Sequence, residues 1–404
     1  MRLLSSPTPS FADHLATHGS LELPPRSILL EAADQSGLLG RGGAGFPTGR
    51  KLRTVAAGSR PEVLGNGCEG EPGSGKDALL LAQQPHLVLD GLQVAAHAVG
   101  ARSAHLAVHR LPNHRPLHAA LAERRDAVPV VLHDVPPRYV ASEESALINL
   151  LNTGTPKPTF TPPRPFEQGI NKRPTLVNNV ETLAHLALIA RHGPAWFREL
   201  GDPDEPGTQL LTLSGMTGAG AVRQVVEVET GAAVTSLLRG AKLTGVQAVL
   251  VGGYFGTWLP MSQARELRLT HRDVRAAGGA LGAGIVIALP QWACGLAETA
   301  RVATYLAAES AGQCGPCFNG LPALAGALRS LAVGPWDDRT MTDLDRWLGV
   351  VSGRGACRHP DGAVRLVLSA LSVFAADVEQ HRAGRPCAGR LLPPVLPLPL
   401  GARG

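Results

Sequence analysis

The chain has 404 residues, of which 44% are hydrophobic and 18% charged, and its 38 Lys and Arg against 33 Asp and Glu give a formal charge of +5. This length predicts about two or three domains, and the composition is typical of a folded chain rather than a disordered one. The opening residues, MRLLSSPTPSFADHL, place Ser and Pro where a secretory signal needs an apolar segment. The uncharged stretch 276–296 is interrupted by glycines and a proline. We therefore expect a buried strand and a loop there, and no direct insertion into a membrane.

The basic residues are mostly arginines and are scattered along the chain, and aromatic residues make up only 4%. Proteins that bind nucleic acid usually concentrate basic residues on one face and add aromatic side chains on which bases stack. The sequence therefore predicts no nucleic-acid binding. A modest positive field is compatible with an acidic protein partner, although a solvated surface is the commoner explanation.

Helices and strands alternate in the first half of the chain. Helical spacing of apolar residues predicts helices, and short apolar runs between turn residues predict strands. The expected helices are 26–35, 79–83, 87–99, 111–125 and 180–191, and the expected strands are 62–64, 103–108 and 128–131. A proline-rich loop, 156–174, precedes the last of these helices. This alternation predicts an α/β domain over residues 1–200.

The pattern changes in the second half. Residues 209–253 read as two strands, a short helix and another strand with glycines between them, which predicts a small β-rich module. We place this module at 205–275. From 296 onward helical spacing dominates, which predicts a helical C-terminal domain over 290–390. The last residues, 391–404, are proline-rich, and we expect an extended tail.

A glycine-rich loop follows the first predicted helix. Gly40, Gly42 and Gly45 have the spacing G-x-G-x-x-G, but a Rossmann dinucleotide site needs a strand directly before it, and here a helix precedes it. The loop can still turn backbone N–H groups toward an anion, with Pro47 opening the next helix and Lys51 adding a positive charge. A glycine-rich turn without a ligand is the alternative.

Acidic and amide side chains gather in three further turns. Carboxylates and Asn side chains at the ends of elements suit hydrogen bonding to a ribose or to ring amides, but helix caps use the same residues. The residues are Asn66, Glu69 and Glu71 in NGCEGEP, then Tyr139, Glu143 and Glu144, and then Asn178 and Asn179. Their occurrence together in one domain favours a binding site.

Several segments, in one order, resemble a known family. They are GRGGAGFPTGRK at 40–51, EGEPGSGKD at 69–77, PHL at 85–87, YVASEESAL at 139–147 and RPTLVNNVETL at 173–183. The chain from Gly37 to Ala376 resembles the NADH-binding flavoprotein subunit of respiratory complex I and its relatives in NAD-linked hydrogenases and formate dehydrogenases. The resemblance implies an α/β FMN domain unlike a standard Rossmann fold, then a small β-grasp (soluble-ligand-binding) module, then a helical iron–sulfur domain.

The resemblance also implies roles for individual residues. The loop from Gly40 to Gly49 and Lys51 would surround the FMN phosphate, Asn66, Asn178 and Asn179 would hold the flavin and its ribityl chain, and Phe46, Glu71 and Glu144 would contact the dinucleotide. The cofactor-binding set is then Gly40, Arg41, Gly42, Gly43, Ala44, Gly45, Phe46, Lys51, Asn66, Cys68, Glu69, Glu71, Tyr139, Glu143, Glu144, Asn178 and Asn179. No catalytic acid or base is expected, because a hydride passes directly from nicotinamide to flavin.

Three residues depart from the family pattern. Cys68 stands where the family has Asp, Ser142 stands where it has Gly, and Arg164 replaces a Phe that would stack on adenine. An arginine can stack on a base or reach an additional phosphate. The sequence therefore leaves NADH and NADPH both open.

The six cysteines are too sparse for a disulfide scaffold. Cys314 and Cys317 form a C-x-x-C pair, which occurs in redox dithiols, zinc sites and iron–sulfur sites. The helical flanks disfavour a thioredoxin-like dithiol, and zinc would need Cys357 and His359 as further ligands.

The resemblance implies a [4Fe–4S] cluster held by C-x-x-C-x-x-C and a later cysteine. Ala311 replaces the first of these cysteines, so Cys314, Cys317 and Cys357 remain. Cys387 is the expected fourth ligand. The alternatives are a three-cysteine cluster, a non-cysteine ligand such as His359, or no cluster, and Cys294 is expected to be a buried structural thiol.

The function implied by these features is electron transfer. NAD(P)H would reduce FMN, and electrons would pass singly through the [4Fe–4S] cluster to a separate carrier, such as a ferredoxin or another redox subunit. Electron flow from ferredoxin to NAD(P)⁺, or a relay or scaffold without nucleotide binding, are the alternatives. We expect a cytoplasmic protein that reaches a membrane only through a partner.

Overall fold

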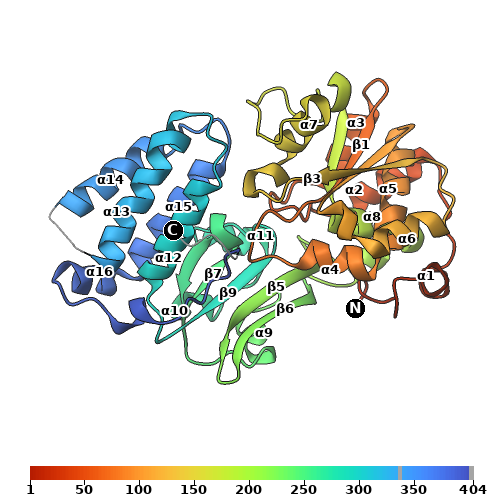
Figure 1. Ribbon diagram of the computed structural model, residues 1–404. Helices are drawn as coiled ribbons and strands as arrows, with labels where there is room; N and C mark the ends of the chain where they lie inside the picture. Colours follow the sequence, from red (N-terminus) through yellow and green to blue (C-terminus); the bar gives the residue numbers. More distant parts are fainter. Residues whose placement is uncertain (335–338, 400–404) are drawn as a thin grey trace. The chain divides into compact units, whose positions relative to one another are not determined.

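The computed structural model describes residues 1–334 and 339–399, and its contacts divide the chain into two compact units (Figure 1). The first unit comprises Met1–Gly70, Gly75–Leu211 and Val225–Ala232. The second comprises Glu71–Ser74, Thr212–Gln224 and the chain from Ala233 on. The residues expected for the β-rich module and for the helical domain therefore lie mostly in one unit. No helix among the described residues is long and apolar enough to cross a membrane.

The first unit is built on a parallel sheet in the order β3-β2-β1-β4. Its strands are β1 (Glu62–Gly67), β2 (Ala104–His109), β3 (Val130–Val135) and β4 (Thr175–Asn179). Its helices are α1 (Phe11–His18), α2 (Arg26–Ser36), α3 (Thr48–Ala56), α4 (Lys76–Gln83), α5 (Pro85–Val99), α6 (Arg115–Glu123), α7 (Glu144–Thr153) and α8 (Val180–Arg198). The predicted α/β class is confirmed.

The sequence predicted most of these elements near their observed positions and missed three. Helix α1 was not expected, β4 is too short to stand out after the proline-rich loop, and α7 begins where only a turn was expected. In α7, Glu143 is the N-cap, and its carboxylate accepts hydrogen bonds from the backbone N–H groups of Ser145 and Ala146 at 2.9 and 3.1 Å. The residues that suggested a turn therefore begin a helix. Side chains that cap a helix are of the same types as those found in turns.

The core of the first unit depends on two buried helices. Nearly all of α5 is buried, and α5 packs closely against α8, whose first three turns are also buried. The two backbones meet at Gly91, where a Cβ atom would lie 2.1 Å from the carbonyl oxygen of Leu183. Only glycine permits this approach.

A five-stranded sheet in the order β6-β5-β9-β7-β8 lies mostly in the second unit, while the first residues of β5 and the last residues of β6 are counted with the first unit. The strands are β5 (Thr208–Thr217), β6 (Gly220–Glu229), β7 (Val246–Val251), β8 (Thr257–Pro260) and β9 (Ile285–Pro290), and the short helices are α9 (Val234–Gly240), α10 (Met261–Ala264) and α11 (His271–Ala276). Strand β9 pairs in parallel with β5 and antiparallel with β7. The buried strand expected within 276–296 is therefore confirmed, and it extends this sheet beyond the range 205–275.

Five helices complete the second unit. They are α12 (Gly295–Ala308), α13 (Leu321–Val333), α14 (Arg339–Val351), α15 (His359–Val373) and α16 (Ala375–Arg382), as the sequence predicted for this region. The proline-rich residues after them are anchored, because the Leu396 N–H donates to Glu298 at 2.8 Å and Leu396 is only 2% exposed. Residues 400–404 of the expected tail lie outside the described residues.

We predict that Gly91→Ala destabilises the first unit by about 1–3 kcal/mol, because the added methyl group overpacks the contact between α5 and α8. The matched control is Gly326→Ala in α13, where a Cβ atom would meet nothing within 4 Å, so that helix propensity should stabilise the chain by about 0.5–1 kcal/mol. Urea unfolding measures both changes. Equal stability of Gly91→Ala and the natural chain would contradict the packing argument.

Candidate functional site

The candidate site lies in the first unit, at the carboxyl ends of β1 and β4. These strands pair in parallel, with Gly65 opposite Asn178 and Asn66 opposite Asn179. The strand order reverses between β1 and β4, because β2 and β3 extend the sheet on one side only. In open α/β sheets, ligands bind outside the carboxyl ends of the strands at such a switch point. The register therefore brings Asn66 to the same edge as Asn178 and Asn179, with Asn179 lying 113 residues after Asn66 in the sequence.

The glycine-rich loop is closed by backbone hydrogen bonds and lies against this edge. Gly40 N–H donates to the Phe46 carbonyl at 2.9 Å, and Thr48 N–H donates to the Leu38 carbonyl at 2.9 Å. Gly43 and Gly45 have positive φ angles of 113° and 61°, which side chains other than glycine rarely adopt. The Arg41 N–H donates to Thr182 Oγ1 at 2.8 Å, which fastens the loop to the start of α8.

The loop also approaches β4 directly. A Cβ atom at Gly42 would lie 3.4 Å from Asn179 Cβ. The helix α2 precedes this loop and α3 follows it, as the sequence predicted, so the arrangement differs from the strand–loop–helix of a Rossmann site.

The side chain of Arg41 points into the protein rather than toward an open site. It is 6% exposed, and its Nη2 donates to the Thr208 carbonyl at 2.9 Å. Its Nε lies 4.0 Å from Glu181 Oε1. Arg41 therefore holds the loop in place through both its side chain and its backbone N–H.

A buried network of charged side chains supports the end of β4 at this edge of the sheet. Lys76 Nζ lies 2.6 Å from Asp77 Oδ1, 3.0 Å from Glu181 Oε2 and 3.0 Å from Asn179 Oδ1. Burial disfavours the charged ammonium, but Asp77 and Glu181 outweigh it and raise the pKa of Lys76. Lys76 and Asp77 belong to a segment that the sequence had singled out, but their supporting role was not predicted.

The three amides have different tasks. Asn179 caps α8 by accepting from Glu181 N–H at 3.0 Å and donates to Asp77 at 2.7 Å. Asn66 donates to the Ser142 carbonyl at 2.9 Å and accepts from Cys68 N–H at 3.0 Å. Asn178 differs from both, because its Nδ2 is buried and has no hydrogen-bond partner among the described residues. A buried amide donor without a partner is costly, so Asn178 is suited to a bound ligand.

Lys51 reaches the same edge from α3. Its Nζ donates to the Val177 carbonyl at 2.6 Å and lies 3.4 Å from Glu144 Oε2. The Lys51 side chain is 17% exposed and that of Glu144 is 34% exposed. A positive charge beside a glycine-rich loop, with a carboxylate near it, fits the phosphate and hydroxyl groups of a nucleotide.

The other predicted cofactor residues divide into structural and accessible ones. Glu69 accepts from the N–H groups of Asp77 and Ala78 at the start of α4, at 3.0 and 3.1 Å. Glu143 caps α7, and burial raises its pKa. Phe46, by contrast, is 42% exposed and lies under the Arg50 guanidinium at 5.8 Å.

Cys68 and Tyr139 are buried. Cys68 belongs to an apolar cluster with Leu64, Ala107 and Val135, and burial followed by the charges of Asp77 and Asp134 raises the pKa of its thiol. The Tyr139 carbonyl accepts from Ser142 Oγ at 2.9 Å.

Ser142 also explains why Gly70 is needed. A Cβ atom at Gly70 would lie 2.4 Å from Ser142 Oγ and 2.6 Å from the Tyr139 carbonyl oxygen. The turn after β1 and the turn before α7 are therefore in direct contact.

Glu71 belongs to the second unit, where its Oε2 accepts from the Tyr254 N–H at 3.1 Å. Arg164 is exposed, and its backbone N–H donates to Glu167 at 2.8 Å.

The cysteines of the second unit form two groups. Cys314 and Cys317 lie at the turn before α13, with their Sγ atoms 3.6 Å apart. Burial opposes ionisation of Cys314, but hydrogen bonds from the backbone of Ala356 and from Cys317 outweigh it and lower the pKa of its thiol. The contact with Ala356 brings the segment of Cys357 to this pair.

We expected Cys387 to be the fourth cluster ligand, beside Cys314, Cys317 and Cys357. In the structure its Sγ lies 3.4 Å from His381 Nε2, in a group with Cys294. Its role as a cluster ligand stays a prediction.

Known proteins are similar to this chain in both sequence and fold. Residues 33–188 match the family described as the Nuo51 FMN-binding domain, and residues 297–381 match the NADH-ubiquinone oxidoreductase-F iron–sulfur binding region. The F 2 subunit of NADH-quinone oxidoreductase from Rhizobium meliloti (strain 1021) is 32% identical over 383 residues, which cover 89% of this chain and 90% of that protein.

The chain belongs to the family of NADH-quinone oxidoreductase F subunits. The F subunit from Escherichia coli (strain K12) is 30% identical, with 88% of this chain and 84% of that protein covered. An NAD⁺-reducing [NiFe]-hydrogenase in the air-oxidised state has a similar structure, with a TM-score of 0.78, 28% identity and coverage of 97% of this chain and 71% of the hydrogenase chain. An NAD⁺-reducing [NiFe]-hydrogenase in the H2-reduced state has a TM-score of 0.76 and 30% identity. The match covers 87% of this chain and 62% of that hydrogenase chain. This member of the F-subunit family thus contains the FMN-binding domain and the [4Fe–4S] binding region that its sequence predicted.

The unpartnered amide gives a direct test of where FMN binds. We expect Asn178→Leu, which is close in size, to weaken FMN binding about 3- to 10-fold, the equivalent of one neutral hydrogen bond of about 0.5–1.5 kcal/mol. It should not lower the stability of the flavin-free protein, because no hydrogen bond within the chain is lost. Quenching of FMN fluorescence measures the affinity, and urea unfolding measures the stability.

Asn179→Leu is the matched control. It removes the cap of α8 and the contacts with Lys76 and Asp77, so it should destabilise even the flavin-free protein. If Asn178→Leu destabilises the flavin-free protein and leaves FMN affinity unchanged, Asn178 is a structural residue and the assignment is wrong.

Proposed function

We propose that this chain oxidises NADH at an FMN held by the carboxyl edge of the β3-β2-β1-β4 sheet, and that electrons leave through a cluster held by Cys314, Cys317 and Cys357. The single observation that carries the proposal is the buried, unpartnered Asn178 Nδ2 at the switch point, next in sequence to Asn179, which the glycine-rich loop approaches. FMN supplies the chemistry, since it takes two electrons as a hydride and releases them singly to an iron–sulfur cluster.

The chain's own residues bind and position the cofactor. The glycine-rich loop brings backbone groups close to a phosphate, and Lys51 adds a positive charge that is already oriented by the Val177 carbonyl. Asn178 would donate to the flavin, while Asn66 and Asn179 fix the two strand ends through their own hydrogen bonds. No side chain has to move a proton for hydride transfer.

Phe46 and Glu144 are the accessible residues that we assign to the dinucleotide. Phe46 offers an exposed ring on which a base or a nicotinamide can stack, and Glu144 offers a half-exposed carboxylate for hydroxyl or amide groups. Arg164 is exposed and offers a guanidinium where the family has a phenylalanine.

The cysteine pair suits an iron–sulfur ligand set. Thiolates are the ligand form, and the Cys314 sulfur already accepts backbone hydrogen bonds of the kind that stabilise a thiolate. Ala311 is 6% exposed and offers no ligand. The fourth iron is therefore left without a cysteine from this motif.

The electron acceptor is a further part of the proposal. Relatives of this chain are named as subunits of NADH-quinone oxidoreductases, and the similar structures are of an NAD⁺-reducing hydrogenase. We therefore expect another redox subunit to receive the electrons, with a ferredoxin as the soluble candidate. Any association with a membrane would come through such a partner.

Anaerobic absorbance spectroscopy tests the nucleotide reaction. We expect NADH to bleach the flavin bands of the FMN-loaded protein within the time of mixing, and we expect NADPH to react more slowly. In Arg164→Phe, which restores the family residue, the apparent KM for NADH should fall because an aromatic ring stacks on adenine. FMN that stays oxidised with both nucleotides would contradict the proposal and would favour a relay that has lost nucleotide binding.

A further inference from the structure

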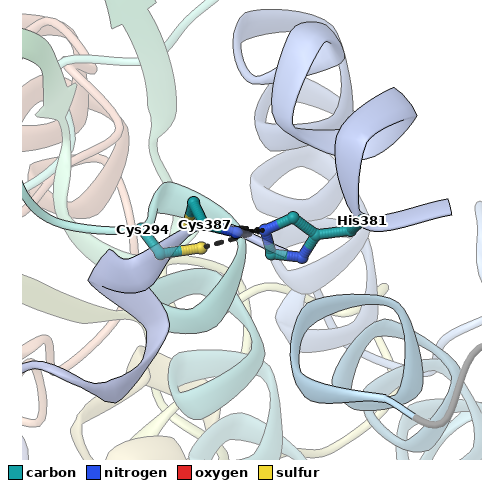
Figure 2. Close-up of side chains that lie close together, drawn as sticks. All are labelled: Cys294, His381 and Cys387. Atoms are coloured by element: carbon teal, nitrogen blue, oxygen red, sulfur yellow. Dashed lines mark hydrogen bonds between the residues drawn. The ribbon is translucent and has the colours of Figure 1, made fainter. Parts of the chain in front are cut away.

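A second group of metal-ligating side chains lies in the second unit. Cys294, His381 and Cys387 come from three separate segments, namely the residue before α12, the last turn of α16 and the turn after it. Figure 2 shows the three residues side by side, with both cysteines next to the imidazole of His381. Cys294 is 1% exposed and His381 is 3% exposed.

The distances suit one metal ion. The ligand atoms all lie within 4.8 Å of one another, with His381 Nε2 3.4 Å from Cys387 Sγ and 4.0 Å from Cys294 Sγ. A tetrahedral Zn²⁺ with Zn–S of about 2.3 Å and Zn–N of about 2.0–2.1 Å separates sulfur from nitrogen by about 3.5 Å. The two observed separations bracket that value, so small side-chain movements would complete the geometry.

The imidazole is already oriented for a metal. His381 Nδ1 lies 3.2 Å from the Leu331 carbonyl, which can only accept, so Nδ1 carries the proton and Nε2 presents its lone pair to the two sulfurs. A metal-binding histidine commonly donates its other N–H to a carbonyl in this way. At present Nε2 accepts from the Cys387 N–H at 3.1 Å, a bond that a metal ion would replace.

Backbone contacts hold Cys294 and the turn that carries Cys387 in place. The Ala297 N–H donates to Cys294 Sγ at 3.4 Å, at the N-terminus of α12, where partial positive charge stabilises a thiolate. Asp377 lies one turn before His381 on α16. The turn after α16 is also held close, because a Cβ atom at Gly389 would lie 2.3 Å from the Trp292 carbonyl oxygen.

We propose that Cys294, His381 and Cys387 bind one Zn²⁺ ion, separate from the iron–sulfur cluster, that fastens the end of α16 and the turn after it to the start of α12. Two thiolates and one imidazole are a ligand set that zinc prefers, and the fourth position is left to water. Cys387 then serves this ion rather than the cluster. The inference is independent of the proposed NADH reaction.

Metal analysis of the full-length protein, purified without oxygen and dialysed against zinc, tests this proposal. We expect about one zinc per chain beside the iron. Cys294→Ser, His381→Ala and Cys387→Ser should each lose the zinc and keep the iron, and Cys314→Ser should lose the iron and keep the zinc. Cys68→Ser, a change of a buried cysteine in the first unit, is the control that should keep both metals.

Cobalt gives a second measurement that needs no variant. Replacing zinc by Co²⁺ in the natural chain should produce thiolate-to-cobalt charge-transfer bands and the intense visible bands of tetrahedral cobalt. A natural chain that holds no zinc and shows no such bands would overturn the proposal. So would loss of iron from Cys387→Ser with zinc retained, which would make Cys387 a cluster ligand, or a Cys294–Cys387 disulfide in the intact protein.

Discussion

The arrangement of the flavin site depends on one buried charge. Lys76 lies at the start of α4 with its ammonium group enclosed by Asp77, Glu181 and Asn179. These partners belong to α4, to α8 and to the end of β4, so a single charge fixes the relative positions of three elements. Removing one partner of such a group leaves a buried charge uncompensated, which typically costs about 3–5 kcal/mol.

The site follows from this constraint. Because Asn179 is held by Lys76 and Asp77, the end of β4 cannot shift, and the parallel register places Asn66 and Asn178 at the same edge. The Arg41 N–H then fastens the glycine-rich loop to α8 through Thr182. The Asn178 amide donor is left buried without a partner at this edge, so a ligand that accepts its hydrogen bond gains affinity.

Much of this fold could be predicted from the sequence, because its signals are local. The helix before the glycine-rich loop, the buried helices α5 and α8 and the C-terminal helices follow from periodicity alone. The family resemblance named the amides and the loop. It could not tell that Glu69 and Glu143 cap helices, since carboxylates at element ends look alike in either role.

Contacts between residues that are far apart in the sequence could not be predicted, for a physical reason. Cys294 and His381 are 87 residues apart, and nothing local in either segment indicates the other. Cys387 stays the predicted fourth cluster ligand, and no local signal in the sequence indicated that its sulfur lies 3.4 Å from His381 Nε2.

The central claim is that one chain holds both an FMN and a [4Fe–4S] cluster that exchange electrons. An anaerobic reductive titration of the loaded natural chain, followed by flavin absorbance and by electron paramagnetic resonance, tests it most directly. The account predicts uptake of about three electrons per chain, two by the flavin and one by the cluster, with a cluster signal that appears as the flavin is reduced. Uptake of only two electrons, with no paramagnetic cluster signal at the end point, would contradict it.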